Sequence, residues 1–185
     1  MAFAEKGYAA TSMEDVAAAA GITKLIVYRH FASKHELYDA VLEGVAERAR
    51  VRFLAGLEEH RPAAGTGAVH ALLAVAREDP AAFTLLWRHA AREPQFAEHA
   101  QRIRQRGVRV TASLLAGVEL GPPRVRRWAA TTVVSYVIEG ILNWLDDGDP
   151  ARDDEVAELL ASSLRAMVTS WAVTEDQVPR RASSS

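Results

Sequence analysis

The chain has 185 residues and a formal net charge of −2 at pH 7, which suits one domain or a small module joined to a larger one. It contains no cysteine, so disulfides, thiolate nucleophiles and sulfur-liganded zinc sites are excluded. Alanine accounts for 35 residues, against 11 glycines and 7 prolines. Because alanine has the highest helix propensity, this composition predicts an all-α protein.

Nothing in the chain predicts a membrane segment. Residues 1–8 lack the charged and apolar regions of a signal peptide. In the most apolar region, residues 128–138 form the longest stretch without a charge, and Glu139 ends it well before the length of a membrane span. We therefore expect a cytoplasmic protein with no membrane partner.

A short helix is predicted after residue 11. Thr11 and Glu14 have the spacing of a capping box, so the helix should begin near Ser12. It should bury Ala17 and end at Gly21, because glycine readily adopts the left-handed conformation that ends a helix.

Two further helices follow. Thr23 can cap a helix from Lys24 to about His30, which would bury Val27 and Phe31. Ser33 and Glu36 form a second capping box that starts a longer helix through Leu37 to Phe53. The first two helices and the turn between them predict a helix-turn-helix, with the third helix completing a three-helix module.

The charge pattern marks one edge of this module. Residues 23–35 contain Lys24, Arg29 and Lys34 and no acidic residue, so this segment carries a local charge of +3. The acids of the module stand in the first turns of helices, where they favour the helix N-terminus. The near-neutral total therefore conceals a basic edge that is typical of a DNA-binding helix.

The sequence from Thr11 to Tyr38 resembles the DNA-binding signature of the tetracycline-repressor (TetR) family of transcriptional regulators. The resemblance rests on Ala20-Gly21-Ile22-Thr23, Tyr28, His30-Phe31, Ser33-Lys34 and Leu37. It implies a homodimer with an N-terminal helix-turn-helix module and a helical ligand-binding and dimerisation domain. We accordingly divide the chain into a DNA-binding domain at 1–45, a C-terminal domain at 46–173 and a tail at 174–185 that we expect to be disordered.

The resemblance also implies which residues contact DNA. Lys24 and Arg29 are the expected readers of base edges, because both side chain types can pair with guanine. The remaining expected contacts are Ser12, Thr23, Leu25, Tyr28, His30 and Lys34. Core packing stays open as the alternative for Tyr28, and an ordinary solvated side chain stays open for Lys34.

The N-terminus departs from the family. Members usually have a longer first helix and a basic arm ahead of the segment that matches Phe3 to Gly7 here. Only two residues precede Phe3, so the first helix could be about 9 Å long. We expect that the natural chain starts upstream of Met1.

Beyond residue 60 the helices become longer. Residues 60–67 are predicted to form a loop, and Asp79-Pro80, Glu93-Pro94 and Gly121-Pro122 mark breaks. We expect helices at about 66–78, 81–92, 95–118, 124–146 and 151–172.

The last two predicted helices are broadly apolar, which indicates burial on more than one side. In the family these helices pair with their symmetry mates, so we expect a dimer interface there. The candidates are Val133, Val137, Ile141, Leu160, Leu164, Met167 and Trp171. Ordinary packing within one chain remains the alternative.

We also predict a ligand pocket between the helices, with plain core packing as the alternative because apolar stripes more often form core. The candidates are Phe83, Leu86, Trp87, Ile103, Val110, Tyr136, Glu139 and Trp144. Glu139 stands among apolar neighbours and is costly to bury alone, so it either reaches the edge of the bundle or meets a cationic partner.

No catalytic or metal-binding motif is present in the sequence: His35-Glu36 lacks a second histidine four residues on, and there is no glycine-rich phosphate loop. We therefore expect no enzyme activity and no cofactor. The prediction is a ligand-responsive regulator, most simply a repressor, whose partners are a palindromic operator, a small-molecule inducer and a second copy of the chain. The alternative is a helical small-molecule-binding or interaction protein with a vestigial DNA-binding module.

Overall fold

The computed structural model describes residues 2–59 and 64–172, and all the regular structure in these ranges is helical. The predicted all-α class is confirmed. The predicted tail at 174–185 and part of the predicted loop at 60–67 lie outside the described residues. None of the described helices is long and apolar enough to cross a membrane.

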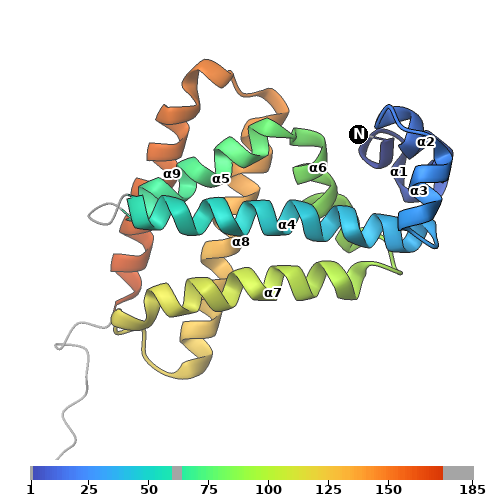
Figure 1. The fold of residues 1–185 in the computed structure, drawn as a ribbon. Coiled ribbons are helices and arrows are strands. Elements are labelled where there is room, and N and C mark those ends of the chain that lie inside the picture. The colour runs from blue at the N-terminus through green and yellow to red at the C-terminus, as the bar shows by residue number, and fades with distance from the viewer. Residues whose placement is uncertain (1, 60–63, 173–185) are drawn as a thin grey trace, which may run out of the picture.

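The N-terminal module consists of α1 (Ala2–Ala10), α2 (Met13–Ala19) and α3 (Lys24–His30), followed by the start of α4 (Lys34–Glu59). In Figure 1 these three short helices gather at one end of the molecule. Helix α1 is broken at Gly7, whose φ of 76° lies in the left-handed region that favours glycine. The first helix was expected to be short, and the break at Gly7 divides it further into two helical turns, one on each side of that residue.

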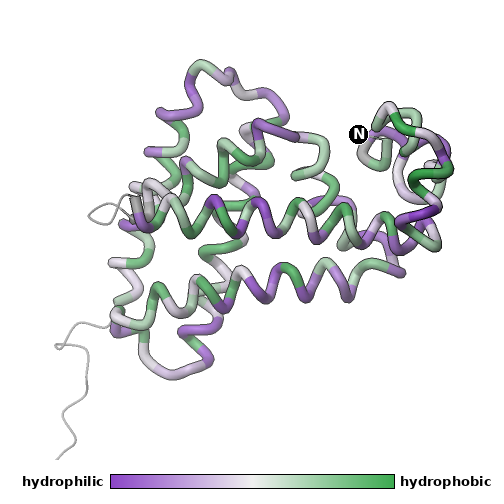
Figure 2. Tube along the Cα trace, in the orientation of Figure 1, coloured by the Kyte–Doolittle hydropathy of each residue, from purple (hydrophilic) through white to green (hydrophobic). Residues whose placement is uncertain are grey.

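The larger part is built from long helices. These are α5 (Ala64–Glu78), α7 (Ala97–Leu114), α8 (Pro123–Asp147) and α9 (Asp153–Trp171). Helix α5 packs along α4 and against α9, and α7 packs against α8. In Figure 2, hydrophilic and hydrophobic residues alternate along α4 and α7, as expected of helices with one face toward the core and one toward solvent.

The predicted helix at 81–92 is three segments. Asp79 accepts a hydrogen bond from the Ala82 amide at 3.0 Å, and Pro80 opens α6 (Pro80–Thr84), as the Asp-Pro pair predicted. A π-helical turn, η2 (Leu85–His89), and a 3₁₀ turn, η3 (Ala90–Arg92), then replace the expected α-helix. Two more 3₁₀ turns, η4 (Leu115–Gly117) and η5 (Pro150–Arg152), flank α8. Propensity does not distinguish these turns from α-helix, so the sequence pattern could not predict them.

An aromatic cluster fixes the module to the larger part. The rings of Tyr38 and Phe96 lie 4.2 Å apart, and Phe3 and Tyr8 both pack edge-on to Tyr38. Burial raises the pKa of the Tyr38 hydroxyl to about 12. The same core cluster contains Leu85 and Leu86 of η2. The module is thus held by residues that come after the proposed boundary at 45, and α4 runs through that boundary without a break.

Candidate nucleic-acid interface and ligand cavity

Helix α2 begins one residue later than predicted, and a different pair caps it. The Asp15 amide donates to Ser12 Oγ at 3.0 Å, and the Ser12 amide donates to Asp15 Oδ2 at 2.8 Å. The capping box is therefore Ser12 with Asp15, not Thr11 with Glu14. Thr11 is buried instead, and its hydroxyl donates to the Gly7 carbonyl at 2.7 Å. The hydrogen bond from Lys6, together with those from Ser12, lowers the pKa of Asp15 far below its usual range.

The turn between α2 and α3 follows the prediction. Gly21 has a φ of 66°, and the Ile22 amide donates to the Ala17 carbonyl at 3.0 Å. Thr23 occupies the N-cap position of α3, but its side chain makes no capping hydrogen bond. The second predicted capping box is half formed: the Glu36 amide donates to Ser33 Oγ at 3.1 Å, whereas the Glu36 carboxylate accepts from the Ala32 amide.

Helix α3 presents most of its side chains to solvent. Val27 is its one buried residue, and Phe31 is half-buried. The predicted DNA contacts Thr23, Lys24, Leu25, Tyr28, Arg29 and His30 are all exposed on this helix or at its start. Leu25 is 75% exposed, and Tyr28 does not pack in the core. Within residues 2–59 and 64–172, the one ion-pair contact of Lys24 is a long one of 3.9 Å with Glu14.

Two predicted contacts are already engaged within the chain. The hydroxyl of Ser12 is exposed but belongs to the α2 cap, where it also donates to Asp15 Oδ2 at 2.6 Å. Lys34 Nζ donates to the Tyr8 carbonyl at 2.9 Å and to the Ala9 carbonyl at 3.3 Å. It also lies 4.4 Å from the centre of the Tyr8 ring. A cation at the carbonyl end of α1 is favourable there, so Lys34 joins α4 to α1.

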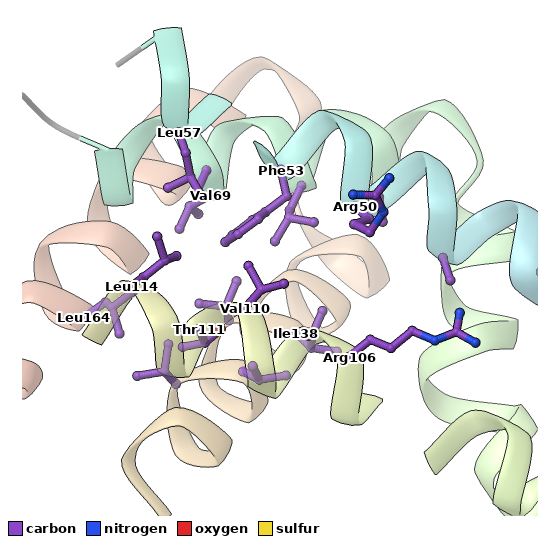
Figure 3. A pocket seen from close by; sticks show the side chains of 18 of the residues that line it. Arg50, Phe53, Leu57, Val69, Arg106, Val110, Thr111, Leu114, Ile138 and Leu164 are labelled. Atoms are coloured by element: carbon purple, nitrogen blue, oxygen red, sulfur yellow. The ribbon is translucent and has the colours of Figure 1, made fainter. Parts of the chain in front are cut away.

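The larger part encloses a cavity of about 400 Å³. Side chains of α4, α5, α7, α8 and α9 line it, and most are apolar, among them Phe53, Val69, Val110, Ile138 and Leu164 (Figure 3).

Three of the eight predicted pocket residues line this cavity: Trp87, Ile103 and Val110. Phe83 and Leu86 are buried core residues, and Tyr136 packs against a buried cluster that includes Ile138 and Ile141. Glu139 is exposed, which matches the edge-of-bundle alternative rather than a ligand contact. Trp144 Nε1 donates to Asp153 Oδ1 at 2.6 Å. The pattern of apolar residues could not separate these positions, because a core stripe and a cavity wall have the same spacing.

The predicted dimer residues divide into two groups. Val133, Val137 and Leu164 line the cavity and Ile141 is fully buried, so the chain's own packing occupies these side chains. Leu160, Met167 and Trp171 retain exposed surface. The structure adds Trp128, 53% exposed with its ring 4.8 Å from that of Trp171, and Leu159, 63% exposed. Both were missed, because exposure within an apolar stripe depends on which neighbours cover it.

Two family models match this chain. The model described as "Bacterial regulatory proteins, tetR family" matches residues 1–41, and the model described as "Tetracyclin repressor-like, C-terminal domain" matches residues 62–171. The first covers the helix-turn-helix module and the start of α4, and the second covers the cavity-lining helices that follow α4.

Individual relatives are similar to this chain either in sequence over a short segment or in fold over almost the whole length. The HTH-type transcriptional activator FasR of Mycolicibacterium smegmatis is 49% identical over 41 residues, 22% of this chain and 19% of FasR. The HTH-type transcriptional repressor KstR2 of Mycobacterium tuberculosis is 43% identical over 51 residues, 28% of this chain and 26% of KstR2. The matched segments thus span about a quarter or less of these curated relatives. A crystal structure of a transcriptional regulator from Rhodococcus sp. Rha1 is 26% identical with a TM-score of 0.69, covering 94% of this chain and 93% of that chain.

Proposed function

Because the chain belongs to the TetR family of bacterial regulatory proteins, we propose that it is a transcriptional regulator that binds a palindromic operator as a homodimer and responds to a small molecule. The matched family is one of regulators rather than enzymes, which agrees with the absence of a catalytic motif in the sequence. We propose repression as the sign of regulation, with release on ligand binding.

The observation that carries this proposal is the exposure of α3. Helix α3 has seven residues and buries only Val27, so it contributes little to the core of the module. Its other side chains are therefore available to a partner. Lys24 and Arg29 on this helix supply the donors that guanine edges accept. In Figure 1, α3 lies at the outer edge of the module, beside the start of α4 and away from α5, α8 and α9.

A tryptophan pair on α8 and α9, with Trp128 exposed and Trp171 half-buried, supports a dimer. Trp128 and Trp171 form an apolar patch with their rings in contact, and aromatic residues are enriched at protein interfaces. A two-fold axis through this face would make the contact isologous. The two α3 helices then have to lie about 34–36 Å apart to enter successive major grooves.

The cavity and α4 supply a physical route for a ligand response. Trp87 lines the cavity, while its neighbours Leu85 and Leu86 pack in the cluster that holds the DNA-binding module. Helix α4 contributes residues to both. A ligand that binds one arrangement of these helices more tightly shifts the population toward it, and with it the spacing of the α3 pair.

A footprint on the DNA upstream of the chain's own gene tests the function. We expect protection of a palindrome by the wild-type chain, and loss of sequence preference in Lys24→Ala and Arg29→Ala. Arg109→Ala is the matched control, because Arg109 is exposed on α7 far from the module in sequence. No selective binding to any fragment, with the chain folded and dimeric, would contradict the proposal and favour a ligand-binding protein with a vestigial module.

A further inference from the structure

The charged side chains around the cavity are all paired. Arg50 donates to Glu47 at 2.6 and 2.8 Å, and Arg106 donates to Glu43 at 2.6 and 3.0 Å. Arg165 donates to Glu158 at 2.9 Å. Each of these six side chains is between about two-fifths and three-fifths exposed, so the pairs stand at the rim in contact with water.

The rim charges also point away from the interior. In Figure 3 the guanidinium groups of Arg50 and Arg106 extend to one side, away from Phe53, Val110 and Leu114. A charged ligand group placed among those apolar side chains would lose its hydration without meeting a free counter-charge. Such burial is costly, so the cavity selects against both anions and cations.

Thr111 supplies a polar group on the wall of the cavity. It lies on α7, lines the cavity and is only 7% exposed. No hydrogen bond of its hydroxyl is found among the described residues, and a hydroxyl can both donate and accept. A hydroxyl that lines a cavity without a partner in the protein can exchange a hydrogen bond with an oxygen of a bound ligand.

We propose that the cavity binds an uncharged, largely hydrophobic molecule that carries one hydroxyl or carbonyl oxygen, held by the Thr111 hydroxyl. This inference rests on the proposed ligand response and names the chemistry of its ligand. The volume of about 400 Å³ lies within the range of small-molecule sites.

The test uses three probes that share one alkyl chain and differ in charge. Purified chain is loaded with the neutral fluorophore N-phenyl-1-naphthylamine, which is then displaced with 1-decanol, decanoate or decylammonium at pH 7. Val110→Trp, which fills the cavity, should abolish fluorophore binding and so locate it. We expect decanol to displace the fluorophore at a concentration at least about tenfold lower than either ion.

Two variants isolate the hydroxyl. Thr111→Val keeps the shape of the side chain and removes the oxygen, and should weaken decanol about tenfold while leaving fluorophore binding unchanged. Thr169→Val, an exposed site on α9, is the control and should change neither. Thermal melts establish that all variants are folded.

Two results would overturn the inference. One is displacement by decanoate as effective as that by decanol and weakened in Arg50→Ala or Arg106→Ala, which would indicate an anion site. The other is an unchanged response of Thr111→Val to decanol. Operator binding is measured separately. If the chain binds its operator but prefers decanoate, only the proposed ligand class is refuted. If the chain binds decanol through Thr111 but binds no DNA, only the proposed regulatory function is refuted.

Discussion

The guanidinium of Arg77 holds the carboxylate of Asp153 through two parallel hydrogen bonds, Nε to Oδ2 at 2.9 Å and Nη2 to Oδ1 at 2.9 Å. Trp144 Nε1 donates to the same carboxylate, and Arg77 also donates to the Gly148 carbonyl at 3.2 Å. One carboxylate at the start of α9 therefore connects α5, α8 and α9. Bidentate pairs of this kind are among the strong hydrogen bonds of proteins.

Asp153 should make stability depend on pH in the acid range. The hydrogen bond from Arg77 lowers its pKa below the usual 3.8, with Trp144 adding to the effect. A lowered pKa in the folded state contributes stability that is present above the unfolded-state pKa and is lost as the pH falls through the folded-state pKa. We expect Asp153→Asn to cost about 1–3 kcal/mol at pH 7 and much less at pH 3. Urea unfolding at both pH values measures this, and an equal loss at both would contradict it.

The crossing of α4 and α5 should tolerate no side chain at Gly56. A Cβ built there would lie 2.5 Å from the backbone oxygen of Gly67 on α5. Gly56→Ala should therefore destabilise by about 1–3 kcal/mol through overpacking, despite the better helix propensity of alanine. Gly44→Ala on the same helix is the control, because its Cβ would meet only Arg48 at 3.7 Å. It should stabilise by up to about 1 kcal/mol, and a similar response of both variants in urea unfolding would refute the close approach.

Lys34 should affect both folding and DNA affinity. If it contacts phosphate, Lys34→Ala weakens binding to all sequences and reduces the slope of log affinity against log salt by about 1. Because Lys34 Nζ also donates to the Tyr8 and Ala9 carbonyls, the same variant should lower the thermal midpoint. Titrations at several salt concentrations separate the two effects. A lower midpoint with an unchanged slope would leave Lys34 a purely structural role.

Leu25 should read a thymine methyl group. Half of the large hydrophobic side chains that are exposed in the described ranges lie between Ile22 and Tyr28, and Leu25 is the most exposed of them. An apolar side chain in the major groove distinguishes thymine by its methyl group. Replacing one half-site thymine by deoxyuridine should weaken wild-type binding about fourfold, the effect of about 0.8 kcal/mol for one methyl-sized group.

The matched experiment is the same replacement with Leu25→Ala. This variant should bind the thymine operator more weakly and show no further loss with deoxyuridine. Sensitivity that persists in Leu25→Ala, or no sensitive thymine in the half-site, would place the contact elsewhere.

The exposed apolar side chains of α8 and α9 should hold the dimer. We expect Trp128→Ser and Leu159→Ser each to raise the dimer dissociation constant by more than about tenfold in sedimentation equilibrium, since exposed aromatic anchors dominate such contacts. Val51→Ser, on a half-exposed residue of α4, is the control. Dimers that resist both changes would show that another face associates.

The sequence predicted the order of the helices and most of their starts and ends, because caps and breaks depend on neighbouring residues. Gly21, Asp79-Pro80 and the Ser33 cap act over four residues or fewer, so neighbouring residues suffice to identify them. Thr11 shows the limit of this reasoning: it has the right spacing for a cap, but burial under α1 gives its hydroxyl other partners.

The cavity and the association surface depend on contacts that spacing does not encode. Val133 and Val137 belong to the same apolar stripe as Ile141, yet two of them line a cavity and the third fills the core. The bonds of Lys34 to α1 span 25 and 26 residues, and the Arg77 pair spans 76. Such pairings follow from how the helices pack against one another. The spacing of apolar residues in a single sequence does not specify that packing.

The uninterrupted run of α4 through 26 residues makes it a rigid rod about 39 Å long. Its second half lines the cavity, and Tyr38, near its start, belongs to the aromatic cluster that holds the DNA-binding module. A rod of that length magnifies small angles: a tilt of about 5° moves the far tip by about 3.4 Å, the rise of one base pair. We therefore expect a small tilt of α4 to move α3 by a distance comparable to one base step.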